Sequence, residues 1–249
     1  MFDVVATPGF LAALAVSALA GFMRGFLGFG SGMLMAPVFA VLFGPTATVG
    51  VIVLMESVVT IQLWPSVRKQ IEWRIVAPMG AVAAAMMPIG SWLLVSLDPD
   101  SLTRLIAIVV LVSVLILAMG WRYQGTKRPS ASVGVGAISG VLMAATSLGN
   151  PPVALYFLSS GDEAATSRAN FTGYFAVTLV ALIAWMLAMG LIDTSVGLLA
   201  AAMLPVFSLA SWAGARFFQR SDDQLYRRAA LLLLALVAGY VLVRDYFGG

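Results

Sequence analysis

The sequence carries one unusual pattern twice. Gly21–Pro37 reads GFMRGFLGFGSGMLMAP, and Gly140–Pro152 reads GVLMAATSLGNPP. In each stretch, small residues and proline interrupt an apolar run, and longer apolar segments follow. When Pro37 is aligned with Pro152, matching residues recur downstream in both halves. Interrupted apolar segments at corresponding positions of two halves are typical of membrane transporters that bind their substrate between the halves.

The composition identifies the solvent of most of this chain as lipid. Of its 249 residues, 61% are hydrophobic and only 10% are charged, and the mean hydropathy is +1.00. Soluble domains contain roughly 25% charged residues. Apolar runs such as Leu102–Met119 and Leu231–Val243, extended at their ends, approach the ~20 residues that cross a bilayer. We therefore expect an integral membrane protein whose main partner is the lipid bilayer.

Two residue types are missing, and their absence excludes several classes of function. The chain contains no cysteine and no histidine, so thiol chemistry, iron–sulfur ligation, imidazole–metal sites and Ser-His-Asp catalysis are ruled out. The net charge of +3 comes from basic residues at segment ends, without the basic stripe that nucleic-acid binding requires. We therefore expect no enzyme activity, no metal, no cofactor and no nucleic-acid partner.

The apolar pattern predicts an all-α multi-pass membrane protein with two repeats of about five segments each. Residues 1–122 form the first repeat, residues 123–131 a polar, basic cytoplasmic linker, and residues 132–249 the second repeat. The second segment of each repeat is too short to span easily, which predicts broken or re-entrant helices near the midplane. The expected segments are 8–27, 32–43, 47–64, 74–96, 102–121, 132–148, 151–160, 167–189, 194–218 and 225–244.

The loop charges predict that the two repeats have opposite orientations. Basic residues within 68–74 and 122–128 mark those loops as cytoplasmic, and the acidic residues of 98–100 place that loop outside. In the second repeat the loop that corresponds to 98–100 is the basic stretch 216–228. Inverted repeats follow, provided that the first two segments of each repeat return the chain to its starting side.

Two charged residues, Arg24 and Glu56, lie inside apolar segments. A charge at the bilayer centre costs about 2.5–3.5 kcal/mol on insertion scales, so each needs a physical reason. Arg24 either provides a counter-charge for an anion or snorkels from a segment end. Glu56 either carries a proton and couples transport to it, or forms a structural pair with Arg24, or lies at the lipid edge.

The glycine-rich break is a candidate anion site. Gly28, Gly30 and Gly32 flank Ser31 and precede Pro37. Glycine lets the backbone turn and expose N–H groups, and proline is favoured in a first helical turn. A half-helix that begins here directs its positive end and a hydroxyl into the membrane. The alternative role for the small residues is close helix packing.

The corresponding break in the second half is less rich in glycine. Its Pro-Pro step removes backbone hydrogen bonds and leaves carbonyls that need partners. Arg168 opens a later segment, and it either faces the same cavity or pairs with Asp162 and Glu163 at the surface. The second-half candidates for substrate binding are Ser147, Asn150, Pro151, Pro152, Tyr156 and Arg168.

These residues together resemble a known family. The stretch GFMRGFLGFGSG with Pro37, then Glu56, then the second-half Asn-Pro-Pro and Arg-Ala-Asn sequences, are similar to the TauE/SafE sulfite exporter family, also called the toluene sulfonate uptake permeases. The resemblance covers nearly the whole chain. It implies a bacterial inner-membrane protein that moves sulfite, sulfonates such as sulfoacetate, or other small anions. It also implies a substrate site between Gly28–Pro37 and Ser147–Pro152.

Two departures indicate that the half-sites differ. The second half has Leu148-Gly149-Asn150 where the first has a denser glycine cluster, and the position aligned with Arg24 is Ser139. We expect a secondary transporter that works by alternating access, with one repeat rocking against the other. Alternatives are an uncoupled anion channel and a non-transporting membrane assembly partner. A homodimer is possible, and the anion, the direction and the coupling ion remain open.

Overall fold

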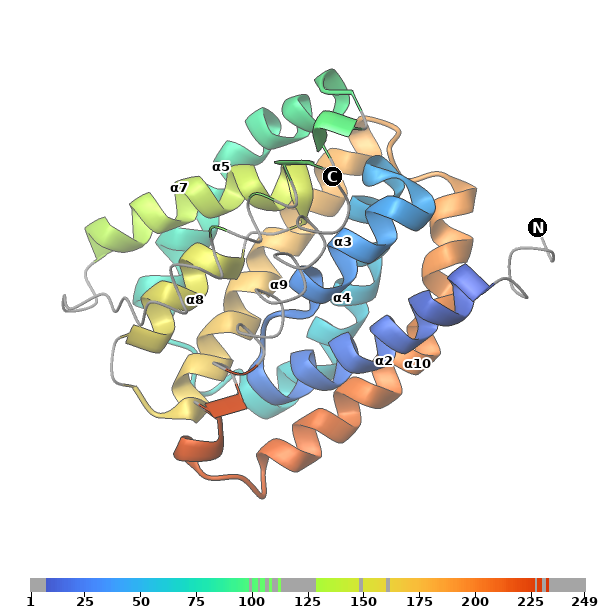
Figure 1. The fold of residues 1–249 in the computed structure, drawn as a ribbon. Coiled ribbons are helices and arrows are strands. Elements are labelled where there is room, and N and C mark those ends of the chain that lie inside the picture. Colours follow the sequence, from blue (N-terminus) through green and yellow to red (C-terminus); the bar gives the residue numbers. More distant parts are fainter. Residues whose placement is uncertain are drawn as a thin grey trace.

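The computed structural model describes residues 8–98, 100–102, 104–105, 108, 112, 129–147, 150–159, 162–226, 228–229 and 232. In this part of the chain every regular element is an α-helix, which confirms the all-α prediction (Figure 1). The expected segments 102–121 and 225–244 lie largely outside it, as do linker residues 123–128. The helices are α2 (Pro8–Leu27), α3 (Ser31–Phe43), α4 (Pro45–Val67), α5 (Trp73–Ser96), α7 (Pro129–Thr146), α8 (Asn150–Ser159), α9 (Ala164–Ala188) and α10 (Thr194–Phe218).

Five of the described helices are long and apolar enough to cross a membrane. They are α2, α4, α5, α9 and α10, so the chain is a multi-pass membrane protein. The 13 residues of α3 and the 10 residues of α8 extend about 20 and 15 Å at 1.5 Å per residue. Both are shorter than the ~30 Å hydrocarbon core, as expected for the second segment of each half.

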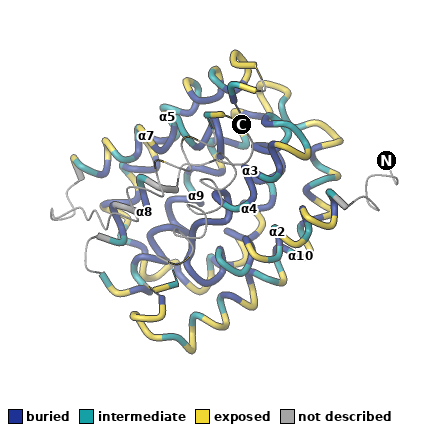
Figure 2. Tube along the Cα trace, viewed as in Figure 1, coloured by how far each residue is buried: buried dark blue, intermediate teal, exposed yellow. Residues whose placement is uncertain are grey.

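Burial divides the described helices into inner and outer ones. The inner helices α4 and α9 run through the middle of the molecule, and most of α9 between residues 164 and 182 is buried (Figure 2). The outer faces of α5 and α10 carry exposed apolar side chains, among them Trp92, Leu209 and Trp212. Large exposed apolar side chains on outer helices are expected where lipid is the solvent. The buried charged side chains lie on these inner helices or contact them.

Small residues bring two pairs of helices into backbone contact. A methyl group on Gly25 of α2 would overlap the carbonyl oxygen of Ser211 in α10, and one on Gly140 of α7 would overlap that of Ala83 in α5. Membrane helices lack a hydrophobic driving force for association and gain from such close packing. Small residues therefore allow close packing at Gly25 and Gly140, and each contact joins a helix of one half to a helix of the other.

The close contacts also fix how the halves correspond. Gly214 of α10 lies against the carbonyl of Phe22, and Gly90 of α5 lies against that of Val141. Val141 is 119 positions after Phe22, and the same separation joins the helix starts at Ser31 and Asn150. The positive-φ residues Gly28 and Ser147 are also 119 apart. Through α2–α4 and α7–α9, corresponding residues therefore lie 119 positions apart.

This correspondence corrects the alignment of Pro37 with Pro152, which are 115 positions apart. The proline alignment is out of register by four residues, about one helical turn. The contacts between helices follow the same correspondence, since α2 packs on α10 as α7 packs on α5. An internal repeat is thus supported, while the opposite orientation of the halves stays a prediction from the charge pattern.

Replacing Gly25 by alanine tests the close α2–α10 contact. Because the added methyl meets backbone rather than a flexible side chain, we expect a destabilisation of about 1–3 kcal/mol. Thermal unfolding of the detergent-purified protein measures it. Gly197→Ala is the matched control, since a methyl at Gly197 has no heavy atom within 4 Å. Equal melting temperatures for the two variants would contradict the packing.

Candidate functional site

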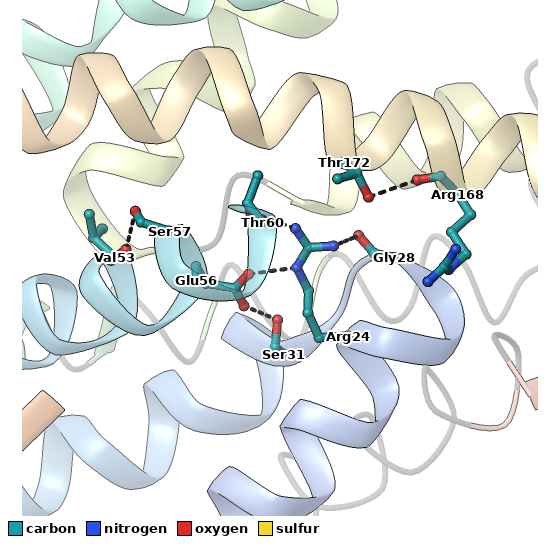
Figure 3. A network of polar contacts seen from close by, with 9 residues as sticks. All are labelled: Arg24, Gly28, Ser31, Val53, Glu56, Ser57, Thr60, Arg168 and Thr172. Atoms are coloured by element: carbon teal, nitrogen blue, oxygen red, sulfur yellow. Dashed lines mark hydrogen bonds and ion pairs between the residues drawn. The ribbon is translucent and has the colours of Figure 1, made fainter. Parts of the chain in front are cut away.

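Arg24 is completely buried in the last turn of α2. Its Nε donates to Glu56 Oε2 at 2.6 Å, its Nη1 to the Gly28 carbonyl at 2.6 Å, and its Nη2 to Thr60 Oγ1 at 2.9 Å (Figure 3). The guanidinium also lies over the Phe175 ring, 4.4 Å from its centroid. All three nitrogens have partners inside the protein, so the interpretation of Arg24 as a snorkelling side chain is wrong.

Glu56 is the counter-charge of Arg24. It is buried in α4, accepts from Arg24 through Oε2, and accepts the Ser31 hydroxyl through Oε1. The structural pairing of Glu56 with Arg24 is thereby confirmed, and a position at the lipid edge is excluded. Thr60 lies one helical turn after Glu56 on the same helix, which explains how both reach one guanidinium.

The first helix break positions this cluster. Gly28 and Gly30 have φ values of 84° and 92°, which glycine adopts without the steric cost of a side chain. The turn ends α2, starts α3 at Ser31, and leaves the Gly28 carbonyl to accept from Arg24. Pro37 was expected in the first turn of this half-helix but is the seventh residue of α3. That expectation is wrong, because the glycines rather than the proline set the start.

The second break reaches the same place. A cavity lies between the halves and is bounded by Glu56 and by Ser147, which follows the end of α7. Its volume of about 10 Å³ is close to the space of one water molecule. An anion the size of sulfite therefore needs the two breaks to separate before it can enter. The lining residues are Gly32, Ile52, Val53, Glu56, Met143, Ser147, Phe175 and Leu179.

Ser147 combines two unfavourable features. Its φ of 60° is in the left-handed region that favours glycine, and its hydroxyl is buried. No hydrogen-bond partner of that hydroxyl occurs within the described residues. Buried polar groups are normally hydrogen-bonded, so each exception calls for an explanation.

Arg168 is a second buried guanidinium close to the first. It is 5% exposed, its Nε donates to the Gly25 carbonyl at 3.0 Å, and it lies over the Phe218 ring at 4.9 Å. Within the described residues its Nη2 has no hydrogen-bond partner, and the ion pair is Arg24–Glu56 alone. The alternative in which Arg168 pairs with Asp162 and Glu163 is therefore wrong.

Some predicted site residues lie elsewhere. Tyr156 is buried in α8 and packs against the Phe157 ring, outside the cavity lining. Pro152 is half-buried in the first turn of α8, and Asn150 begins that helix. The side chains of Asn150 and Pro151 lie outside the described residues.

Asn170, the last residue of the Arg-Ala-Asn sequence, is hydrogen-bonded to Glu72. Its Oδ1 accepts the Glu72 N–H at 2.8 Å, and its Nδ2 donates to Glu72 Oε2 at 2.6 Å. Asn170 thus ties α9 to the loop before α5.

Sequence reasoning missed several residues that shape the site. Thr60 was detectable, because it lies four residues after Glu56 in a helix. The apolar members gave no signal, since methionine, phenylalanine and leucine are common throughout this chain. No group of three potential metal ligands occurs in the described part of the chain. The missed residues are Thr60, Met143, Phe175 and Leu179.

The comparison with protein families agrees with the geometry. The model of the family described as sulfite exporter TauE/SafE matches residues 13–241. The chain belongs to this family. Members of the family are membrane transporters rather than enzymes. By its family, this chain is therefore a membrane transporter. No curated protein and no solved structure matches the chain.

The buried pair makes a prediction about stability. Removing one partner leaves an uncompensated charge, so Arg24→Met and Glu56→Leu should each destabilise the protein by about 3–5 kcal/mol. The double variant should recover much of the loss, because apolar residues often replace a buried pair at little cost. Unfolding of all four proteins completes a double-mutant cycle. Additive losses in the double variant would show that the pair is not coupled.

Proposed function

We propose that this chain is a secondary transporter of a small sulfur-containing or organic anion, such as sulfite or a sulfonate. It acts in the bacterial inner membrane by alternating access and couples transport to protons through Glu56. The observation that carries the proposal is the buried contact between Arg24 and a carboxylate. A guanidinium that binds a carboxylate also binds other oxyanions, including the pyramidal sulfite and the tetrahedral sulfonate group, because its N–H groups are charged donors to any anionic oxygen.

In this proposal Glu56 and the substrate compete for Arg24. Without substrate, the Glu56 carboxylate accepts from Arg24 and from Ser31. When Glu56 takes up a proton, it loses its charge, and Arg24 is free to bind the incoming anion. The charges within the cluster balance in both states: Arg⁺ with Glu⁻, or Arg⁺ with a monoanion and neutral Glu. Because the net charge of the Arg24–Glu56 cluster is the same in both states, one proton is linked to one monoanion.

Arg168 adds a second positive charge to the site. Both arginines contact the last turn and end of α2, through the Gly25 and Gly28 carbonyls. Arg24 also donates to two side chains, whereas Nη2 of Arg168 has no hydrogen-bond partner among the described residues. We assign to Arg168 the role of attracting the anion and binding it before or after it reaches Arg24. Ser31, Ser147 and the backbone of the two breaks complete the proposed site.

Proton coupling is tested with Glu56→Gln, which keeps an oxygen for Arg24 but cannot take up a proton. Proteoliposomes that contain the wild-type protein should accumulate labelled sulfite or sulfonate from the external solution when that solution is made acidic. The variant should still exchange anion but should lose acid-driven accumulation. Glu163→Gln, at an exposed position before α9, is the control.

Other outcomes of this assay separate the alternatives. Acid-driven accumulation by Glu56→Gln at the wild-type level would remove the coupling role. Steady currents far above transporter turnover would identify a channel. A folded protein that moves none of the tested anions would favour the assembly partner.

Arg168→Gln tests the second cation. Loss of a charged hydrogen bond should raise the KM for the anion by about tenfold or more, while proton coupling persists. Arg216→Gln serves as the control, because Arg216 also lies over an aromatic ring, at 4.1 Å from Trp212, but on the outer helix α10. An unchanged KM in Arg168→Gln would show that Arg168 does not bind the anion and that its role is structural, as in its contact with α2.

A further inference from the structure

The second half replaces the charged pair and the threonine of the Arg24 cluster by apolar side chains. Corresponding residues lie 119 positions apart in these helices, so the counterparts of the Arg24 cluster can be read directly. Gly28 and Ser31 correspond to the polar Ser147 and Asn150, whereas the other three counterparts are apolar and line the cavity beside Glu56. The corresponding pairs are Arg24 with Met143, Glu56 with Phe175, and Thr60 with Leu179.

The second-half wall of the cavity therefore provides one hydroxyl group for hydrogen bonding, and its other side chains are apolar. Met143, Phe175 and Leu179 provide the apolar surface, and Ser147 provides the hydroxyl. Every oxygen of a buried oxyanion needs a donor, because an unsatisfied polar group is costly in a low-dielectric interior. The wall is thus suited to the uncharged part of an organic anion, while the charged group lies on the side of Arg24 and Ser31.

Ser147 fits this role because its local structure is unfavourable without a ligand. Its counterpart Gly28 has φ 84° without a side chain, whereas Ser147 adopts φ 60° with one. Its hydroxyl is buried and lacks a partner within the described residues. Backbone strain and an unused buried donor at one residue, beside a cavity, are the pattern expected of a ligand contact.

Leu179 separates the cavity from a larger space. A groove of about 380 Å³ lies between α4 and α9, and Leu179 is part of both linings. The residues of this groove are corresponding pairs, so it lies symmetrically between the halves. It is lined by Ser57, Thr60, Ile61, Trp64, Ala176, Leu179, Val180 and Ile183.

We propose that the second half recognises the uncharged part of the transported anion, with Ser147 as its hydrogen-bond donor and Leu179 as the residue that limits its length. This inference rests on the proposed anion transport and deepens it. Leu179 is 2% exposed and closes the cavity on the side of the groove. Shortening it joins the two spaces and makes room for a longer chain.

Competition by a series of alkanesulfonates tests the proposal. Uptake of labelled methanesulfonate into proteoliposomes is measured with methane-, ethane-, butane- and hexanesulfonate as competitors. In Leu179→Ala, butanesulfonate should improve relative to methanesulfonate by about tenfold, because added methylenes gain a pocket. Leu182→Ala is the matched control, since Leu182 is buried on the same helix and lines neither space.

Ser147→Gly provides an independent test that does not rely on truncating the core. Glycine relieves the positive φ, so the variant should unfold at a higher temperature than wild type while it binds 2-hydroxyethanesulfonate, whose uncharged part carries a hydrogen-bond acceptor, more weakly. Ser211→Ala is its control, because that hydroxyl is also buried and unpartnered in the described part of the chain but lies in α10. Removing it should leave the anion affinity unchanged.

The failures of the two proposals are distinguishable. If no sulfonate or sulfite is transported by folded wild-type protein, the proposed function fails. If anions are transported but Leu179→Ala keeps the wild-type chain-length preference, the length role of Leu179 fails alone. If Ser147→Gly keeps full affinity, Ser147 is not a ligand contact.

Discussion

The need to pair a buried charge determines the arrangement around Arg24. An arginine that is fully enclosed in a membrane protein requires a counter-charge and a partner for each donor group. Glu56 supplies the charge, and Thr60 and the Gly28 carbonyl accept the remaining donors. The break after α2 has positive φ values, which only glycine readily adopts. This backbone positions the Gly28 carbonyl to accept from Arg24. A different backbone at Gly28 would leave part of the guanidinium unsatisfied.

The two helix breaks share one backbone arrangement but carry different side chains. Both halves end a long helix at a positive-φ residue and start a short helix three residues later. In the first half the turn lies beside Arg24 and Glu56, and in the second it lies beside Met143 and Phe175. Phe175 contacts Arg24 directly, so the two sets of side chains meet. Duplication therefore explains the shape of the site, and divergence explains why the Arg24–Glu56 pair has no charged counterpart in the second half.

The sequence predicts the bounds of the helices better than it predicts which residues of the two halves correspond. Segment length and hydropathy locate α2 to α5 and α7 to α10 within a few residues, because bilayer thickness sets both. The pairing of Arg24 with Glu56 was one of few ways to neutralise two isolated charges. The proline alignment failed because Pro37 lies inside α3 while Pro152 lies in the first turn of α8. Contacts such as Arg24 with Phe175 depend on tertiary packing and have no local signal.

The packing also constrains how the site opens. A motion of one half against the other would have to break the contacts of α2 with α10 and of α5 with α7, where glycines allow backbone-to-backbone approach. Such closely packed helices move as units, since the contacts leave no space for sliding. The cavity is lined by residues of α3, α4, α7 and α9 and by Ser147. Separation of the α2–α10 pair from the α5–α7 pair would therefore preserve these close contacts, whereas separation of the repeats as wholes would break them.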